Sequence, residues 1–232
     1  MTNTLELTIL DSDGGSRQIE FSPSRMFNGG LAGSNPKEVE KHIEELAEIG
    51  IPPSKFIPTL YAVGAHLLTT DQHIQVHGDK TGGEVEYVLL WHEDDIYVTV
   101  GSDHTDLWLE RHSSPKAKNV CQNIIPPVVW RYEDVRDHFD ALELESFVRI
   151  DGEWRDYQRD KVSSLLQPSY WIDRLLDRVD GSQGLVFLSG TIPALGSLLH
   201  GDAYRVRIRD PILDRRIEHE YVCDIISGFE DF

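Results

Sequence analysis

Three carboxylates in one predicted hairpin have the types and spacing of a cation-binding site. In the segment EVEYVLLWHEDDIYVTVGSDHTD, Glu84 and Glu86 lie two residues apart and Asp103 stands near the end. Apolar residues alternate on both sides of a polar turn at 92–95, which predicts a β-hairpin with one apolar face. In its register Glu84 faces Asp103, and Glu86 faces Gly101, which leaves room beside it. Since opposed residues and residues two apart share a face, the three carboxylates converge.

These carboxylates would repel one another unless a positive charge lay between them. A site built from oxygen ligands, without sulfur, suits a hard divalent cation, which means Mg²⁺, Mn²⁺ or Ca²⁺. The alternative is that the acidic side chains occupy the solvent-exposed face of an amphipathic hairpin, as acidic residues on exposed strands often do. Asp106 falls outside the register and is the weaker candidate for a ligand.

The composition is that of a globular protein with an acidic surface. The chain has 232 residues, enough for a single domain with a substantial core, and residues 1–30 are an optional small N-terminal β-hairpin lobe. Its formal net charge of −18 argues against nucleic-acid binding through a basic surface. Abundant aspartate with little lysine also suits work in high salt, so a halophilic source is one hypothesis.

The sequence also gives expectations for location and cysteine chemistry. No stretch approaches the length of a membrane span, and the first residues do not combine a basic region with an apolar one. We therefore expect a cytoplasmic protein without membrane contact. Cys121 and Cys223 lie far apart without CxxC spacing, which predicts buried free thiols rather than a disulfide or a zinc site.

The elements around the hairpin are predicted from the residues that start and end helices and from the spacing of apolar residues. Asn35 and Pro36 suit the start of a helix that ends at Gly50. The glycine-rich residues 28–35 before it are expected to form a flexible connector. Residues 158–178 have the apolar spacing of an amphipathic helix that Pro168 bends or breaks. Strands predominate elsewhere, mostly in hairpins, which gives a mixed α/β, strand-rich fold class.

Several motifs in a fixed order connect this site with a known family. They are His42-x-x-Glu45 on the predicted helix, Glu84-x-Glu86 and Asp103-x-Thr105 on the hairpin, Lys118 in SPKAKNVC, and the segment SGTIPALGSLLHGD. This ordered set resembles the fumarylacetoacetate hydrolase superfamily over about residues 28–210. The resemblance implies a β-roll-like core with peripheral helices. It also implies dimerisation, so a homodimer is expected.

The resemblance implies a metal and a lysine at the centre of the site. Glu84, Glu86 and Asp103 would hold Mg²⁺ or Mn²⁺, with Ca²⁺ as a further option. Lys118 would sit beside the substrate oxygens as a positive charge or proton donor. Its alternative is a surface lysine, and Lys116 is near enough in sequence to be confused with it.

The remaining motifs imply groups that handle protons and substrate. His42 and Glu45 would form a dyad that activates water or carries a proton, and their alternative is an ordinary exposed helix pair. Gly190 and Thr191 would offer a backbone N–H and a hydroxyl to the substrate carboxylate, or else form a plain turn. Thr105 is the third residue expected to contact substrate.

The implied chemistry follows from the cation. A 2-oxo acid chelates it through carboxylate and keto oxygens, and the cation stabilises the enolate formed when a bond beta to the ketone breaks. The resemblance therefore implies a metal-dependent hydrolase or lyase of a small 2-oxo or dioxo carboxylic acid, most concretely an enzyme of acylpyruvate C–C hydrolysis. Dehydration, decarboxylation or isomerisation of a sugar-derived oxo acid on the same fold is the alternative.

Departures from the family pattern keep two non-enzymatic hypotheses open. Leu107 stands where relatives commonly have arginine, the connector before His42 is longer, and the gap from Asp103 to Lys118 is shorter than in acylpyruvate hydrolases. These departures suit a protein that keeps the fold and binds a metabolite without turnover. A structural Ca²⁺ site on an interaction module is the second hypothesis.

Overall fold

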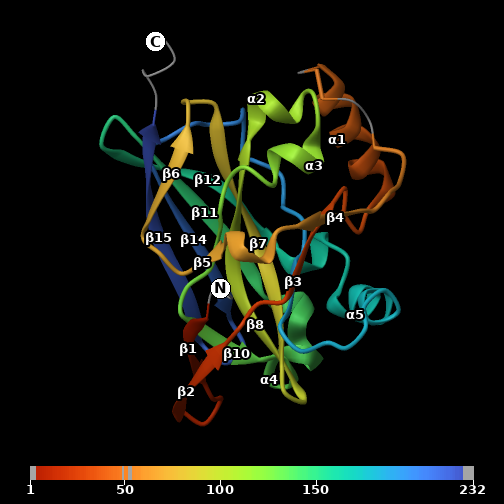
Figure 1. Ribbon diagram of the computed structural model, residues 1–232, viewed down its shortest axis with the longest axis vertical. Coiled ribbons are helices and arrows are strands. Elements are labelled where there is room, and N and C mark those ends of the chain that lie inside the picture. The colour runs from red at the N-terminus through yellow and green to blue at the C-terminus, as the bar shows by residue number, and fades with distance from the viewer. Residues whose placement is uncertain (1–3, 49, 52–53, 227–232) are drawn as a thin grey trace.

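The computed structural model describes residues 4–48, 50–51 and 54–226, without the side chains of residues 42, 45 and 46. Within this part the chain forms two β-sheets with short helices at their margins (Figure 1). The predicted mixed α/β, strand-rich class is confirmed.

The larger sheet has ten strands among the described residues. Its main path runs β2 (Ser16–Phe21), β1 (Leu5–Leu10), β10 (Val128–Arg131), β8 (Asp95–Asp106), β7 (Thr81–His92), β13 (Leu185–Leu188), β3 (Arg25–Gly30) and β4 (Thr59–Val63). Strand β9 (Asn123–Ile124) pairs with β8 off this path, and β5 (Leu68–Thr69) pairs with β9. The hairpin of β1 and β2 thus continues the large sheet, while the single domain over residues 1–232 and its optional lobe stay predictions.

The smaller sheet has five strands in the described part of the chain. They run in the order β12 (Glu153–Lys161), β11 (Glu143–Ile150), β14 (Ala203–Asp210), β15 (Arg215–Ile226) and β6 (His73–His77). The main hydrophobic core contains side chains of both sheets, including Val85 and Tyr87 of β7, Leu144 of β11 and Val206 of β14. The other face of β7 packs into a second core through Val88 and Leu90. Strand β7 is therefore buried on both faces.

The helices are short and lie beside the sheets. They are α1 (Pro36–Glu48), α2 (Leu107–Glu110), α3 (Ser114–Ala117), α4 (Tyr132–Val135), α5 (Pro168–Leu176) and the 3₁₀ turns η1 (Ala65–Leu67), η2 (Arg136–Ala141) and η3 (Val162–Ser164). Helices α1, α2 and α3 gather at the upper end in Figure 1. Helix α1 begins as predicted, with the Asn35 side chain accepting from the Lys37 N–H at 3.1 Å, and Gly50 follows it with a φ of +88°.

The predicted flexible connector at residues 28–35 is wrong for its first part. Residues 28–30 belong to β3, which pairs with β13 on one side and β4 on the other. The glycines there permit close packing, because a Cβ added at Gly29 would lie 2.6 Å from the carbonyl oxygen of Ser189. The sequence suggested that these glycines make the chain flexible. In the structure, the small size of Gly29 instead lets two backbones approach each other.

Gly29→Ala is expected to lower the free energy of unfolding by about 1–3 kcal/mol, because the added methyl must displace backbone atoms. Urea-induced unfolding measures this loss. Gly196→Ala is the matched control, since a Cβ there meets nothing within 4 Å, and it should change stability by less than about 0.5 kcal/mol. Equal stability of the two variants would contradict the packing argument.

The predicted helix over residues 158–178 is also wrong in its first half. Residues 158–161 end strand β12, which pairs with β11 along its length, and η3 follows. Helix α5 begins only at Pro168, because proline suits the first turn of a helix, where its missing N–H has no partner to lose. Proline starts this helix instead of bending it.

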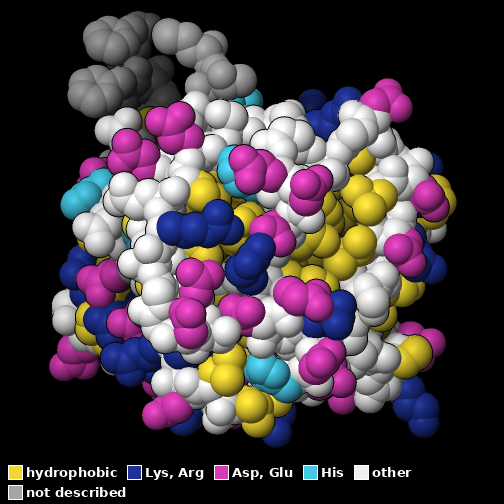
Figure 2. Space-filling model, turned by 90° about the horizontal axis from the view of Figure 1, so that it is seen from below, with side chains coloured by type: hydrophobic (Ala, Val, Ile, Leu, Met, Phe, Trp, Pro, Cys, Tyr) yellow, Lys and Arg dark blue, Asp and Glu magenta, His cyan; other side chains and the backbone are white. Residues whose placement is uncertain are grey.

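One face of the molecule (Figure 2) shows how the charged side chains are distributed. On the face in Figure 2, aspartate and glutamate side chains are scattered among lysine and arginine. In the described residues, none of the helices has the length and apolar character needed to cross a membrane. Cys121 and Cys223 are both free and buried, as predicted.

Candidate metal and substrate site

The hairpin of β7 and β8 has the predicted register. Glu84 pairs with Asp103, Glu86 with Gly101, and a tight turn at Glu93 and Asp94 joins the strands. The room at Gly101 has a different use from the predicted one. A Cβ there would lie 2.6 Å from Cγ2 of Val88, so the glycine admits that apolar side chain.

The three predicted carboxylates come together. One oxygen from each of Glu84, Glu86 and Asp103 lies within 4.8 Å of the others. Glu86 is 1% exposed and Asp103 is fully buried, so the alternative of a solvent-exposed acidic face is wrong. Three carboxylates at this spacing, two of them buried and Glu84 half-buried, have the chemistry and geometry of a site for a hard divalent cation.

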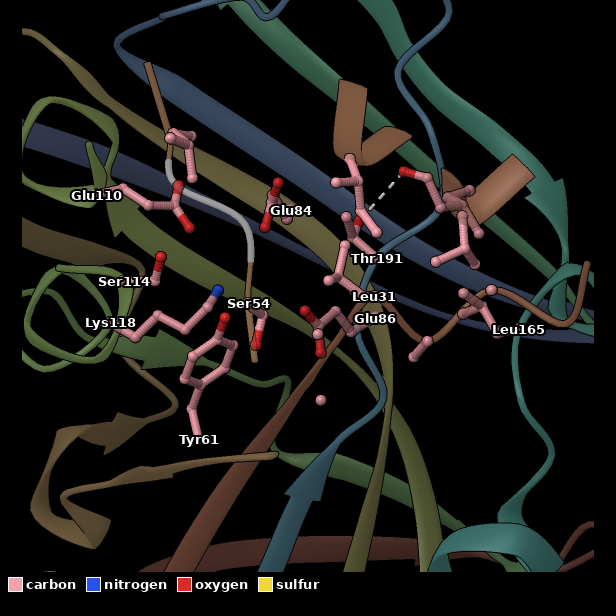
Figure 3. Close-up of a pocket in the computed structure, with 18 of the residues that line it drawn as sticks. Leu31, Ser54, Tyr61, Glu84, Glu86, Glu110, Ser114, Lys118, Leu165 and Thr191 are labelled. Carbon is pink, nitrogen blue, oxygen red and sulfur yellow. Dashed lines mark hydrogen bonds between the residues drawn. The ribbon is translucent and has the colours of Figure 1, made fainter. Parts of the chain in front are cut away.

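Glu84 and Glu86 line a cavity of about 720 Å³, and Asp103 is buried next to them. Its lining comes from β3 and the residues after it, from α1, from α2 and α3, and from the segments around Leu165 and Thr191. In Figure 3, Lys118 and Glu110 lie on one side of Glu84 and Glu86, and Leu165 lies on the other. The cavity therefore has a charged end and an apolar end.

Lys118 provides the positive charge at the charged end. It is the one buried lysine or arginine among the described residues, and its ammonium group forms an ion pair with Oδ2 of Asp103. The same ammonium lies 5.7 Å from the centroid of the Tyr61 ring. Lys116 is exposed, so the structure places Lys118, rather than its neighbour, at the cavity.

Burial and mutual repulsion act against ionisation of the carboxylates. Burial raises the pKa of Glu84 to about 7, with Glu110 and Asp103 adding to the shift and Lys118 opposing it. Burial and then Asp103 raise the pKa of Glu86 well above its ordinary value. Burial alone would lower the pKa of Lys118, but the carboxylates, Asp103 foremost, raise it. A divalent cation would favour the ionised carboxylates.

The three expected substrate contacts have protein partners of their own. The Gly190 N–H donates to Oε2 of Glu86 at 2.7 Å, which fixes that carboxylate. The Thr191 hydroxyl donates to the Val85 carbonyl at 2.9 Å and lines the cavity. The Thr105 hydroxyl donates to Oδ1 of Asp103 at 3.3 Å. Each therefore holds the strand or a carboxylate, and their contact with substrate stays a prediction.

The predicted dyad of His42 and Glu45 lies outside the described side chains. Both residues belong to α1, which borders the cavity through Glu38, Val39 and Ile43. The helix that carries the motif is thus at the site, while the dyad itself stays a prediction.

Sequence reasoning missed a fourth carboxylate, that of Glu110. It lines the cavity, and burial raises its pKa, an effect that Lys118 opposes. Asp106 positions this residue, because its side chain accepts from the Leu109 N–H at 2.9 Å and so begins helix α2. An acidic residue four positions after a potential helix cap was the signal that could have found it.

His104 points to the opposite face from Asp103, as the alternation of the strand predicts. Its ring contacts the Tyr221 hydroxyl at 3.0 Å and the Thr81 hydroxyl at 2.9 Å. Burial lowers the pKa of His104 to about 3, so the imidazole is neutral at pH 7. It is a packed core residue behind the site.

Comparison with solved structures places the chain in the fold of the fumarylacetoacetate hydrolase superfamily. One similar structure is 2-keto-3-deoxy-D-arabinonate dehydratase, with a TM-score of 0.66 and 13% identity over 91% of this chain and 77% of that chain. Another is Cg1458, with a TM-score of 0.63 and 15% identity over 91% of this chain and 80% of that chain. A structure from Yersinia pestis CO92, described as a putative fumarylacetoacetate hydrolase family protein, has a TM-score of 0.62 and is 15% identical to this chain. The match covers 93% of this chain and 98% of that chain.

The sequence itself matches one family model. The model is described as "Protein of unknown function (DUF2848)" and matches residues 29–221, so the chain belongs to the DUF2848 family. No curated protein matches the chain.

Proposed function

We propose that the protein is a divalent-metal-dependent enzyme that acts on a small 2-oxo or dioxo carboxylic acid. The observation that carries the proposal is the convergence of Glu84, Glu86 and Asp103 beside Lys118 at a cavity of about 720 Å³. Three buried charged groups beside the half-buried Glu84 are costly to fold, and such sites are characteristically functional.

Each group has a stated task in this proposal. Glu84, Glu86 and Asp103 hold Mg²⁺ or Mn²⁺, with Ca²⁺ as a further option, and the bound cation supplies a Lewis acid for an enolate. Lys118 neutralises Asp103 and offers a proton or a positive charge to substrate oxygens. Gly190 holds Glu86 through its N–H, so that the carboxylate keeps its direction.

Proteins with the same fold support this reaction class. The dehydratase structure with magnesium and 2,5-dioxopentanoate is 14% identical to this chain, with a TM-score of 0.62. A 4-oxalocrotonate decarboxylase from Pseudomonas putida G7, solved with magnesium and adipate, is 12% identical with a TM-score of 0.51. These named activities support a lyase as much as an acylpyruvate C–C hydrolase.

The finer parts of the proposal depend on residues beyond the carboxylates. For C–C hydrolysis, His42 and Glu45 on α1 would activate the attacking water. Dehydration, decarboxylation or isomerisation of an oxo acid keeps the same cation and lysine. We also propose a homodimer that works in the cytoplasm.

A thermal-shift titration tests the proposal. Mn²⁺ or Mg²⁺ should raise the melting temperature, and oxalate, which resembles a pyruvate enolate, should raise it further only when metal is present. Glu86→Gln should lose both shifts while keeping the fold, because an amide oxygen can still accept from the Gly190 N–H. Ca²⁺ should be compared in the same series.

The matched control is Glu93→Gln, at an exposed position in the turn of the same hairpin. It should keep both shifts. If metal and oxalate leave the wild-type melting temperature unchanged at low and high KCl, the proposed function fails. Stabilisation by Ca²⁺ alone, without an oxalate effect, would instead favour a structural calcium site.

A further inference from the structure

The apolar end of the cavity has no task in the chemistry proposed above. The apolar side chains of the cavity lining include Leu31, Ala32, Val39, Ile43, Leu165 and Ile192. In Figure 3, Leu165 lies on the far side of Glu84 and Glu86 from Lys118. A cavity of about 720 Å³ is in the range that holds drug-sized ligands, so it has room for a chain well beyond an oxo-acid head.

The charges around the cavity limit what that chain can be. Among the described lining residues, the lysines are Lys118 and the exposed Lys55, the histidine is the exposed His112, and there is no arginine. Lys55 follows Ser54, which lies on the Lys118 side of Glu86 in Figure 3, and His112 follows helix α2 on the side of Glu110. Lys118 is already paired with Asp103, and Glu38 adds a carboxylate from α1. A second carboxylate at the apolar end, on the far side of Glu86 from these cations, would lose hydration against apolar side chains without gaining a positive partner there.

We propose that the substrate is a monocarboxylic oxo acid with an alkyl or aryl tail, which packs against this apolar end. The inference rests on the proposed function, because the head group needs the metal and Lys118. Each methylene buried there should tighten binding about fourfold. The tail, and not a second charged group, would then set the specificity.

The test measures binding of 2-oxo acids to the Mn²⁺-loaded full chain by isothermal titration calorimetry. From pyruvate to 2-oxohexanoate, which adds three methylenes, the Kd should fall about 50-fold. The matched comparison is 2-oxoadipate, which has the same chain length and a distal carboxylate. It should bind at least about tenfold more weakly than 2-oxohexanoate.

A charge variant tests the position of the tail. Ile43→Arg on α1 should weaken the binding of 2-oxohexanoate and tighten the binding of 2-oxoadipate. The order of the two affinities should then be reversed. Ile212→Arg, at a position that is 62% exposed away from the cavity lining, should leave the order unchanged. Circular dichroism checks that both variants fold.

The two levels of the proposal can fail separately. If pyruvate binds only with Mn²⁺ but 2-oxoadipate binds as tightly as 2-oxohexanoate, the apolar-tail inference is overturned and the metal-dependent function stands. If none of these acids binds in a metal-dependent manner, the proposed function fails, and the inference fails with it.

Discussion

Lys118→Met is expected to lower the free energy of unfolding by about 3–5 kcal/mol in the presence of EDTA, since it removes one partner of a buried ion pair. Asp103 is fully buried and would lose its partner, while Glu84, Glu86 and Glu110 would lose the positive charge that offsets their repulsion. Turnover of any oxo-acid substrate should be lost as well. Urea-induced unfolding in the presence of EDTA measures the loss in the free energy of unfolding.

The pH dependence of this loss has a defined sign. A carboxyl group whose pKa is raised in the folded state destabilises the fold fully above that pKa, and the penalty shrinks as the pH falls from the folded pKa towards the ordinary value of 4.5. Burial already raises the pKa of Glu84 to about 7, and without Lys118 the pKa should rise further. The stability difference between the variant and the wild type should therefore shrink as the pH falls from about 8 to about 6.

Lys116→Met is the control for this experiment, because Lys116 is exposed two positions away. It should change stability by less than about 0.5 kcal/mol at every pH. Adding Mn²⁺ should restore part of the stability of Lys118→Met, since the cation replaces the lost positive charge. A Lys118→Met protein as stable as the wild type in EDTA would mean that the charged cluster does not depend on this lysine.

The sequence predicts the centre of the site well because strand geometry is local. Alternation along a strand and the tight turn at Glu93 together determine which residues face each other, so Glu84, Glu86 and Asp103 could be brought together without any tertiary knowledge. The same alternation places His104 on the opposite face.

The predictions that are wrong have a common physical cause. Each concerns a segment whose structure depends on residues far away in the sequence. Gly29 looks flexible in sequence, yet its backbone packs against residue 189, far along the chain. The polar residues of β12 and the apolar ones of α5 together imitate one amphipathic helix, and only the pairing of β12 with β11 separates them. The apolar end of the cavity likewise combines segments that no local pattern connects.

Gln158 is the residue most affected by this misreading. In a helix it would be an ordinary polar side chain, but in β12 it is 3% exposed and ties both sheets to the loop after β13. Its Oε1 accepts from the Val85 N–H at 3.0 Å and from the Ser146 hydroxyl at 2.9 Å. Its Nε2 donates to the Thr191 hydroxyl at 2.7 Å and to the Ile192 carbonyl at 2.6 Å.

Gln158→Leu should therefore destabilise the protein by several kcal/mol, because each buried polar group left without its partner costs about 1–3 kcal/mol. Gln18→Leu, on the exposed surface of edge strand β2, is the matched control and should cost less than about 0.5 kcal/mol. Urea-induced unfolding compares the two.

The position of Gln158 also predicts an effect on binding that a purely structural residue would not have. Val85 lies between Glu84 and Glu86, while Thr191 and Ile192 line the cavity. The side-chain amide of Gln158 therefore holds the strand that carries the two glutamates and the loop after β13 in place together. Gln158→Glu keeps the acceptor but loses the two donated bonds, and it should weaken oxalate binding to the Mn²⁺-loaded protein more than it weakens Mn²⁺ binding itself. Equal weakening of both would show that Gln158 supports the fold and does not position the cavity wall.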